Sequence, residues 1–326
     1  MDEEVLLRRY ALVGGPDDMI PAGRSRRSSV ISPAVAEREE AMMSDGGALV
    51  EVKGLRIAFG DAVPVRNVSF TIPAHGRVAL VGESGCGKSL TALSLWKDHP
   101  EVRLAYIFQN PMESLNPVMK IGAQIHEAAK GVSREEIVEL LRRTGLEDPG
   151  RVYGAYPCRL SGGQCQRAMI AMALAAKPDL LVADEPTTAL DVTTQREVLE
   201  LIDSLADETG MAVLLITHNL GLVAGRMDTV NVMYAGEIVE SGPVEEVLAH
   251  PRHPYTQGLL KAVPALDASM DAPLADIPGT VPPPNAWPPG CAFHPRCPFA
   301  TEICSHAAPP EKRSGAVRFL CHRKDF

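Results

Sequence analysis

The segment GESGCGKS at residues 82–89 constrains the fold of this 326-residue chain more than any other. It fits the pattern G-x-x-x-x-G-K-[ST], in which backbone N–H groups and a helix N-terminus surround phosphate oxygens. The apolar run 78–81 before it predicts a buried strand, and residues 89–96 after it predict a helix. Such units predict an α/β fold with a mainly parallel sheet and helices on both faces, and the loop pattern is that of a phosphate-binding P-loop.

Each residue type in this loop has a chemical reason to be there. Three glycines let the backbone turn tightly and approach a phosphate: Gly82, Gly85 and Gly87. Lys88 is expected to reach the β- and γ-phosphates, and Ser89 to bind Mg²⁺. Cys86 is either a tolerated small residue or a reactive thiol, because a helix N-terminus lowers a thiol pKa.

A second strand-like run, residues 180–183, ends in two adjacent carboxylates, Asp184 and Glu185. Open α/β sheets bind ligands at the carboxyl ends of their strands, so these acids are expected beside the phosphate loop. Asp184 is expected to hold Mg²⁺. Glu185 is expected to polarise the water that attacks the γ-phosphate.

Two further polar residues follow strand-like runs. His218 comes after residues 213–216 and is either a hydrogen-bond donor to the γ-phosphate or a structural histidine. Gln109 ends the segment 104–108, where it could contact Mg²⁺ and the attacking water. Both predictions depend on the motifs around them rather than on the single residues.

The segment LSGGQ at 160–164 precedes a predicted helix and lies between the phosphate loop and the Asp-Glu strand. In this order the motifs resemble those of the ATP-binding subunit of an ABC transporter. The resemblance implies ATP and Mg²⁺ as cofactors and two nucleotide-binding domains packed head to tail. Ser161 and Gly163 would then contact the γ-phosphate bound to Lys88 of the other subunit.

Other residues take their expected roles from the same resemblance. Gly162 and Gln164 complete the signature loop of the nucleotide site, and Asp191 belongs to the loop that crosses between the two sites. Phe59 lies where the family places an aromatic ring that stacks on adenine; a buried core phenylalanine is the competing interpretation.

Two longer segments narrow the resemblance. Residues 109–117 (QNPMESLNP) and 253–260 (HPYTQGLL) are similar to segments of the dipeptide, oligopeptide and nickel importers. That group implies a second ATPase subunit, two membrane permeases and an external solute-binding protein as partners. It also implies a peripheral position on the cytoplasmic face of the membrane.

Four of the seven cysteines lie in the last 36 residues: Cys291, Cys297, Cys304 and Cys321. This Pro-rich segment shows little periodicity for a hydrophobic core, so a covalent or metal staple is expected. Four thiolates suit a [4Fe–4S] cluster or Zn²⁺, and the cysteines could instead stay unmetallated as thiols or form disulfides. Members of the importer group have a similar cysteine-containing extension.

Composition limits the function classes further. The net charge of -9 argues against a nucleic-acid partner. No run of 18 apolar residues occurs, so the chain is not expected to span a membrane. Residues 1–48 lack periodicity and are expected to be disordered, with Met43 as a candidate native start.

The motifs predict an ATPase domain over residues 49–242, with a small helical subdomain at about 110–160, and a C-terminal extension over 243–326. One feature departs from the family pattern: Lys88 and Gln109 are only 21 positions apart, about half the usual length. A truncated or non-catalytic nucleotide-binding partner in a heterodimeric pair is therefore the second hypothesis.

Overall fold

The computed structural model describes residues 47–188, 190–262 and 277–324. Contacts divide the chain into two compact units: unit 1 includes residues 73–75 and 99–213, and unit 2 includes 50–72, 76–98 and 214–326. The predictions of a disordered N-terminal segment and of a start at Met43 fall almost entirely outside the described residues. The predicted boundary at residue 242 stays a prediction.

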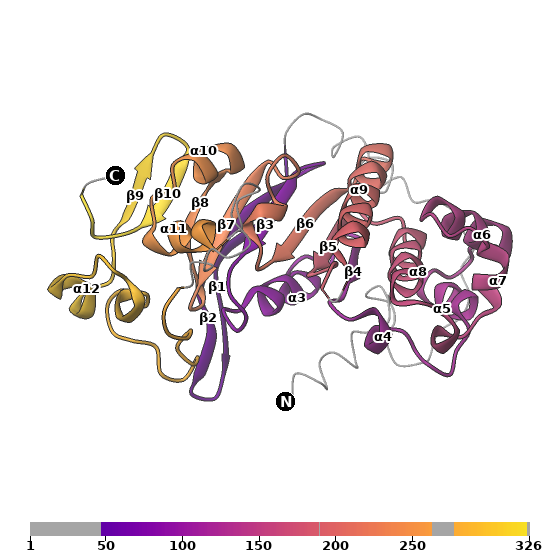
Figure 1. Cartoon of the computed structure of the whole chain (residues 1–326), viewed down its shortest axis with the longest axis horizontal. Coiled ribbons are helices and arrows are strands. Elements are labelled where there is room, and N and C mark those ends of the chain that lie inside the picture. The colour runs from indigo at the N-terminus through magenta and orange to yellow at the C-terminus, as the bar shows by residue number, and fades with distance from the viewer. Residues whose placement is uncertain (1–46, 189, 263–276, 325–326) are drawn as a thin grey trace, which may run out of the picture. The chain divides into compact units, whose positions relative to one another are not determined.

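Unit 2 is built on a mixed sheet with strand order β1-β2-β8-β7-β3-β6 (Figure 1). Its strands are β1 (Ala48–Phe59), β2 (Ala62–Pro73), β3 (Arg77–Val81), β6 (Ala212–Thr217), β7 (Thr229–Tyr234) and β8 (Glu237–Pro243). β3 runs parallel to β7, and β7 runs antiparallel to β8. Residues 78–81 are all buried, which confirms the strand predicted before the phosphate loop.

Helix α3 (Lys88–Asp98) follows the loop and has 11 residues. Its inner face is packed, because the side chains of Thr91, Ala92 and Leu95 are fully buried. Thr91 is also tied to the loop, since its N–H and its hydroxyl both donate to the carbonyl of Gly87 at 2.9 and 3.0 Å. The short spacing between Lys88 and Gln109 therefore leaves a three-turn helix anchored beneath the loop.

The C-terminal residues belong to unit 2 and have a core. Two short strands, β9 (Glu311–Ser314) and β10 (Val317–Leu320), extend the sheet, because β10 pairs antiparallel with β8. Phe293 packs against Tyr234 and Tyr255 with ring centroids 5.1 and 5.4 Å apart. The little periodicity of this tail does not prevent a core, because Phe293 packs against aromatic residues of unit 2 that precede the cysteine segment.

The helices of unit 2 after the sheet are short. They are α10 (Val244–Ala249), α11 (Pro254–Lys261) and α12 (Glu302–His306), with 3-10 turns η3 (Leu220–Leu222) and η4 (His294–Arg296). Helix α11 begins at Pro254 because the imidazole of His253 accepts a hydrogen bond from the Tyr255 N–H at 3.1 Å. That cap fixes where Tyr255 lies.

Unit 1 contains the parallel pair β4 (Leu104–Ile107) and β5 (Leu180–Asp184), in which Ile107 lies opposite Ala183. Its helices are α4 (Pro111–Ser114), α5 (Ile121–Ala128), α6 (Arg134–Arg143), α7 (Pro149–Gly154), α8 (Gly162–Ala175) and α9 (Val192–Thr209), with the 3-10 turn η2 (Pro157–Arg159). Helices α5 to α8 share a buried core that includes Ile125, Ile137 and Leu141. Ser133 and Glu136 match the S-x-x-E pattern that predicts a capping box, and this box is present at the start of α6.

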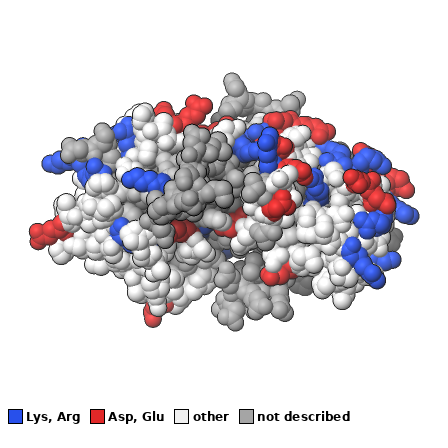
Figure 2. Space-filling view, viewed as in Figure 1, with Lys and Arg blue, Asp and Glu red and all other residues white. Residues whose placement is uncertain are grey.

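Acidic and basic side chains are interspersed on the face that Figure 2 shows. Over its described residues, this face therefore presents no continuous stripe of one charge. Among the helices in the described ranges, none has the length and apolar character needed to cross a membrane.

Candidate functional site

Unit 1 holds a buried carboxylate at the end of β5. Asp184 is 7% exposed and accepts a hydrogen bond from the Tyr106 hydroxyl of β4 at 2.6 Å. Burial and the neighbouring Asp184 charge raise the pKa of Tyr106 well above its usual value, so its hydroxyl keeps its proton. A protonated donor orients the carboxylate of Asp184 at the position where the sequence predicts a Mg²⁺ ligand.

The next residue, Glu185, lies beside Gln109. The Gln109 amide donates to Glu185 Oε2 at 3.1 Å, and the Thr188 hydroxyl donates to the same oxygen at 2.9 Å. Glu185 has φ of 44°, a left-handed conformation that non-glycine residues rarely adopt. The structure thus brings two predicted site residues together and places one of them on a strained backbone, as is common at functional sites.

The signature segment forms the N-terminus of α8. The Ser161 hydroxyl accepts from the Gln164 N–H, and the Gln164 side chain accepts from the Ser161 N–H, both at 3.2 Å. This capping box leaves Gly162 and Gly163 in the first helical turn. A side chain on Gly162 would meet no atom within 4 Å, so the turn presents an open backbone.

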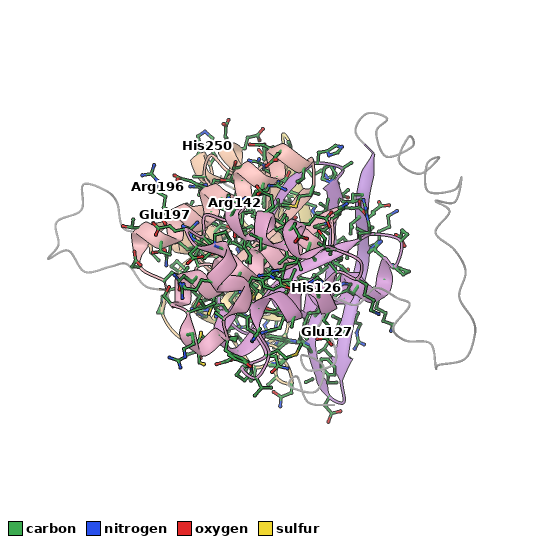
Figure 3. The ribbon with its side chains drawn as sticks, turned by 90° about the vertical axis from the view of Figure 1, so that its right-hand side faces the viewer. His126, Glu127, Arg142, Arg196, Glu197 and His250 are labelled. Atoms are coloured by element: carbon green, nitrogen blue, oxygen red, sulfur yellow. The ribbon has the colours of Figure 1, made fainter. Side chains whose placement is uncertain are left out.

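Helix α9 contacts α8 through Arg167. Arg167 of α8 donates to the Thr144 carbonyl at 2.9 Å and to Glu197 at 2.7 Å. Figure 3 shows Glu197 extending from α9 next to Arg196. Asp191 caps α9, because its carboxylate accepts from the N–H and the hydroxyl of Thr194. The predicted crossing loop includes Ala189, which lies outside the described residues.

Unit 2 holds the phosphate loop between β3 and α3. Gly87 has φ of 102°, and a side chain there would lie 2.6 Å from the Pro64 carbonyl. At Gly82, a side chain would lie 2.2 Å from the Met233 carbonyl. Only glycine fits at these two positions, so the predicted need for glycine has a visible steric cause.

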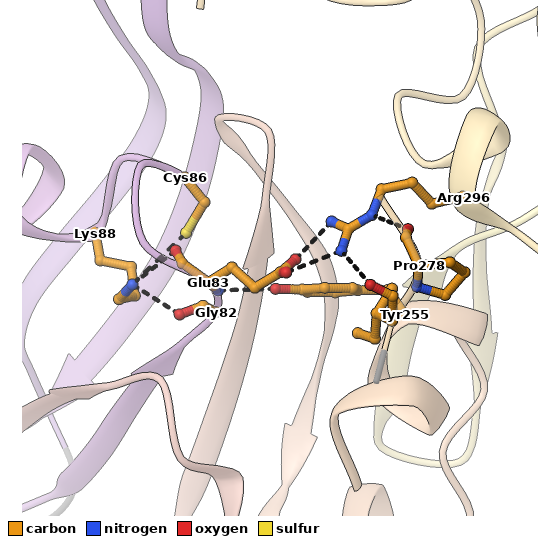
Figure 4. Close-up of polar contacts among 8 residues, drawn as sticks. Gly82, Glu83, Cys86, Lys88, Tyr255, Pro278 and Arg296 are labelled. Carbon is orange, nitrogen blue, oxygen red and sulfur yellow. Dashed lines mark hydrogen bonds and ion pairs between the residues drawn. The ribbon is translucent and has the colours of Figure 1, made fainter. Parts of the chain in front are cut away.

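Lys88 folds back over the loop that precedes it. Its side chain is buried, and its ammonium donates to the carbonyls of Gly82 at 2.7 Å and Glu83 at 3.0 Å (Figure 4). These hydrogen bonds hold the positive charge of Lys88 beside the first two residues of the phosphate loop. A bound phosphate would compete with them for the ammonium.

Cys86 is fully buried and lies 3.9 Å from the Lys88 ammonium. Burial raises the pKa of its thiol, although the Lys88 charge acts in the opposite direction. A reactive thiolate needs a lowered pKa and solvent access. The structure therefore favours the tolerated small residue over the reactive thiol.

His218 comes directly after Thr217, the last residue of β6. The Gly82 N–H donates to the Thr217 carbonyl at 3.3 Å, which places the end of β6 beside the phosphate loop within unit 2. His218 itself is exposed. Phe59, at the end of β1, is 42% exposed, so it is not a buried core residue and its ring is available for stacking.

Two residues that the sequence did not single out also contact the loop. The Tyr255 hydroxyl accepts from the Glu83 N–H at 2.8 Å, and the Arg296 guanidinium forms two bonds to the Glu83 carboxylate. Tyr255 lies in the importer-like segment 253–260, but nothing in the sequence linked that segment to the loop. The only signal for Arg296 is its position inside the cysteine segment.

Two family models match the chain. The model described as ABC transporter matches residues 65–188, and the model described as oligopeptide/dipeptide transporter, C-terminal region, matches residues 239–304. A candidate peptide import ATP-binding protein of Brucella ovis is 45% identical over 313 residues, which takes in 80% of this chain and 93% of that protein. The chain belongs to the ABC transporter ATP-binding family. It is accordingly an ABC-type ATPase subunit, as the motifs implied.

Other comparisons agree with this family. A similarly named protein of Brucella abortus is 42% identical over 313 residues, with 84% of this ABC ATPase and 94% of that protein covered. Each alignment spans 313 positions but takes in only 80% or 84% of this 326-residue chain. The relatives therefore have residues within the aligned stretch that this chain lacks.

Solved structures give the same fold. The structure of cbiO1 from Clostridium perfringens, part of the ABC transporter complex cbiONQ, has a TM-score of 0.55 at 23% identity and covers 62% of this chain and 91% of that one. The ATP-binding cassette MJ0796 bound to ADP and Pi, a dimeric post-hydrolysis state, has a TM-score of 0.51 at 25% identity and covers 60% and 98%. The predicted P-loop fold of ABC type is confirmed.

The four tail cysteines of this ABC ATPase lie in one neighbourhood. The Cys291 N–H donates to the Cys304 carbonyl at 2.8 Å. Burial raises the pKa of Cys291 to about 11, and charges on the other three cysteines add to the shift. Over residues 47–188, 190–262 and 277–324, however, no three His, Cys, Asp or Glu side chains form a group that could hold a metal. In the described residues these thiols are therefore not arranged as a preformed cluster or Zn²⁺ site.

Proposed function

We propose that this chain binds and hydrolyses ATP to energise import of peptides, or of a related solute such as nickel, through partner permeases. One observation carries the proposal: a single chain joins the ABC transporter segment to the C-terminal region of oligopeptide and dipeptide transporters. The names of the relatives from Brucella support the same cargo class.

For nucleotide binding, we propose that the loop N–H groups and Lys88 hold the phosphates while Phe59 stacks on the adenine. Ser89, Asp184 and Gln109 would hold Mg²⁺. A hydroxyl, a carboxylate and an amide are the oxygen donors that this ion prefers. Bound Mg²⁺ would neutralise charge on the phosphates.

For hydrolysis, Glu185 would accept a proton from the attacking water, with Gln109 orienting the same water. The contact of these two side chains supports the pairing of roles. His218 would donate to the γ-phosphate from the end of β6. Phosphoryl transfer depends on positioning and on charge stabilisation, which suits a set of side chains without a covalent nucleophile.

We propose that a second ATPase subunit completes each site with its own signature turn, Ser161 to Gln164, and that Asp191 lies in the loop crossing between the two sites. An α-helix N-terminus with two glycines offers backbone N–H groups to an anion, which supports a γ-phosphate contact. Two permeases and an external solute-binding protein would complete the importer, with this subunit on the cytoplasmic face of the membrane.

Reconstitution tests this function. The subunit, its ATPase partner and their permeases are placed in proteoliposomes with the binding protein and labelled peptides outside. We expect ATP hydrolysis that rises with binding protein and peptide, together with peptide uptake. Hydrolysis without uptake of any peptide or of nickel would contradict the proposed cargo, whereas absence of ATP binding would contradict the proposed chemistry.

A non-catalytic partner role is the second candidate. It is favoured by the short spacing between Lys88 and Gln109 and by the residues that the Brucella relatives have in addition. The anchored helix α3 argues for a competent phosphate loop. ATPase assays of the isolated chain and of its pair with the second subunit separate the two roles.

For the tail we propose that Cys291, Cys297, Cys304 and Cys321 hold a [4Fe–4S] cluster or, in its place, Zn²⁺. Their shared neighbourhood supports the proposal, and metal binding would require the thiols to rearrange. We expect protein purified without oxygen to contain about four irons, or one zinc, per chain. Replacing Cys297 with Ser should remove the metal, and replacing the exposed Cys158 with Ser should not. Metal-free wild-type protein would contradict the proposal.

A further inference from the structure

The C-terminal region contacts the second residue of the phosphate loop. Arg296 donates to both carboxylate oxygens of Glu83, from Nη1 at 2.7 Å and from Nη2 at 2.9 Å (Figure 4). A bidentate Arg–carboxylate pair fixes orientation as well as distance. Residues more than 200 positions apart in the sequence are thereby joined within unit 2.

The guanidinium of Arg296 is itself held in place. Its Nε donates to the Pro278 carbonyl at 2.9 Å, and its Nη2 donates to the Ile277 carbonyl at 3.1 Å. The side chain is 4% exposed, against 31% for Glu83. It also lies over the ring of Tyr234, 5.8 Å from the centroid. A buried arginine whose guanidinium makes four hydrogen bonds is a rigid anchor for a carboxylate on a loop.

The main chain of Glu83 is held from the same region. The fully buried Tyr255 accepts the Glu83 N–H, while the Glu83 carbonyl accepts from the Lys88 ammonium. Burial, with the Cys86 and Glu83 charges, raises the pKa of Tyr255, so its hydroxyl stays neutral. Glu83 thus lies between two C-terminal side chains and the lysine of the phosphate loop.

We propose that Arg296 is a positioning residue for ATP binding. Together with Tyr255 it holds the phosphate loop in place through Glu83, and we call these contacts the clamp. The clamp acts on Lys88, because Arg296 holds the carboxylate of Glu83 while the Lys88 ammonium donates to the carbonyl of the same residue. This inference rests on the proposed function, since it assumes that the loop binds ATP. It assigns the region matched at 239–304 a role in ATP binding, namely the positioning of the phosphate loop.

The test measures equilibrium ATP binding by the full-length chain carrying Arg296→Ala, Arg296→Lys, Glu83→Gln or the double change Glu83→Gln with Arg296→Ala. We expect Arg296→Ala to weaken ATP binding about 10-fold or more, the size expected for lost bonds to a charged group. Arg296→Lys should recover part of this loss. Arg313→Ala is the matched control, because that arginine lies in β9 with a side chain 76% exposed and does not contact Glu83 in any hydrogen bond or ion pair described for it.

Coupling between the two residues separates positioning from general destabilisation. The double variant should bind ATP no more weakly than the weaker single variant, because both changes break one contact. A double variant whose loss of ATP affinity equals the product of the two single losses would overturn the proposal. Folded Arg296→Ala and Glu83→Gln variants that bind ATP within twofold of wild type would overturn it as well. Should Arg296→Ala fail to fold, Glu83→Gln decides, since Glu83 is partly exposed. Wild-type protein that binds no ATP would instead contradict the proposed function.

Discussion

Replacing Glu185 with Gln is expected to lower ATP turnover by about 10²- to 10⁴-fold, the range for loss of a general base, while leaving ATP binding intact. The amide keeps the size of the carboxylate and can still contact Gln109 and Thr188. It cannot accept a proton from water at neutral pH. Steady-state ATPase rates and equilibrium binding of ATP, measured on the same preparation with the partner subunit present, check both halves of this expectation.

Glu147→Gln is the matched control for this change. Glu147 is an exposed glutamate in unit 1, so removing its charge should leave turnover unchanged. Unaltered turnover in Glu185→Gln would contradict the role of Glu185 as general base. It would also favour the non-catalytic partner.

Replacing Lys88 with Ala is expected to weaken ATP binding by about 10- to 100-fold, the cost of losing a charge-assisted bond to phosphate. The structure gives the reason, because the ammonium is already held at the loop by the carbonyls of Gly82 and Glu83. Titration with a fluorescent ATP analogue measures the loss. Thermal unfolding with no nucleotide present shows whether the variant is folded.

Lys97→Ala controls for the loss of positive charge on the same helix. Lys97 lies in the last turn of α3 and is exposed, so its removal should change ATP affinity by less than about twofold. Equal losses in the two variants would show that Lys88 acts through general charge rather than through the loop.

Much of the fold could be predicted because its determinants are local. Apolar runs predicted β3, β5 and β6 to within one residue at each end, and the Ser133 box predicted the start of α6. The contact between Gln109 and Glu185 was not predicted, but their positions just after the parallel strands β4 and β5 explain it. Parallel strands bring their carboxyl ends to the same edge of a sheet.

The parts that were missed depend on long-range packing. In the tail, Phe293 packs against Tyr234 and Tyr255, which precede the cysteine segment in the sequence. No periodicity within the tail could indicate such partners. The Arg296 clamp on Glu83 is likewise invisible in sequence, because neither residue belongs to a fixed position of the loop pattern.

The central claim is that ATP is enclosed between the Lys88 loop of one subunit and the Ser161 turn of another. Sedimentation of the Glu185→Gln chain with its natural partner ATPase subunit, with and without ATP and Mg²⁺, tests it most directly. We predict that the subunits sediment separately without ATP and as a stable pair with it. Protein that binds ATP but shows no ATP-dependent pairing would contradict the claim.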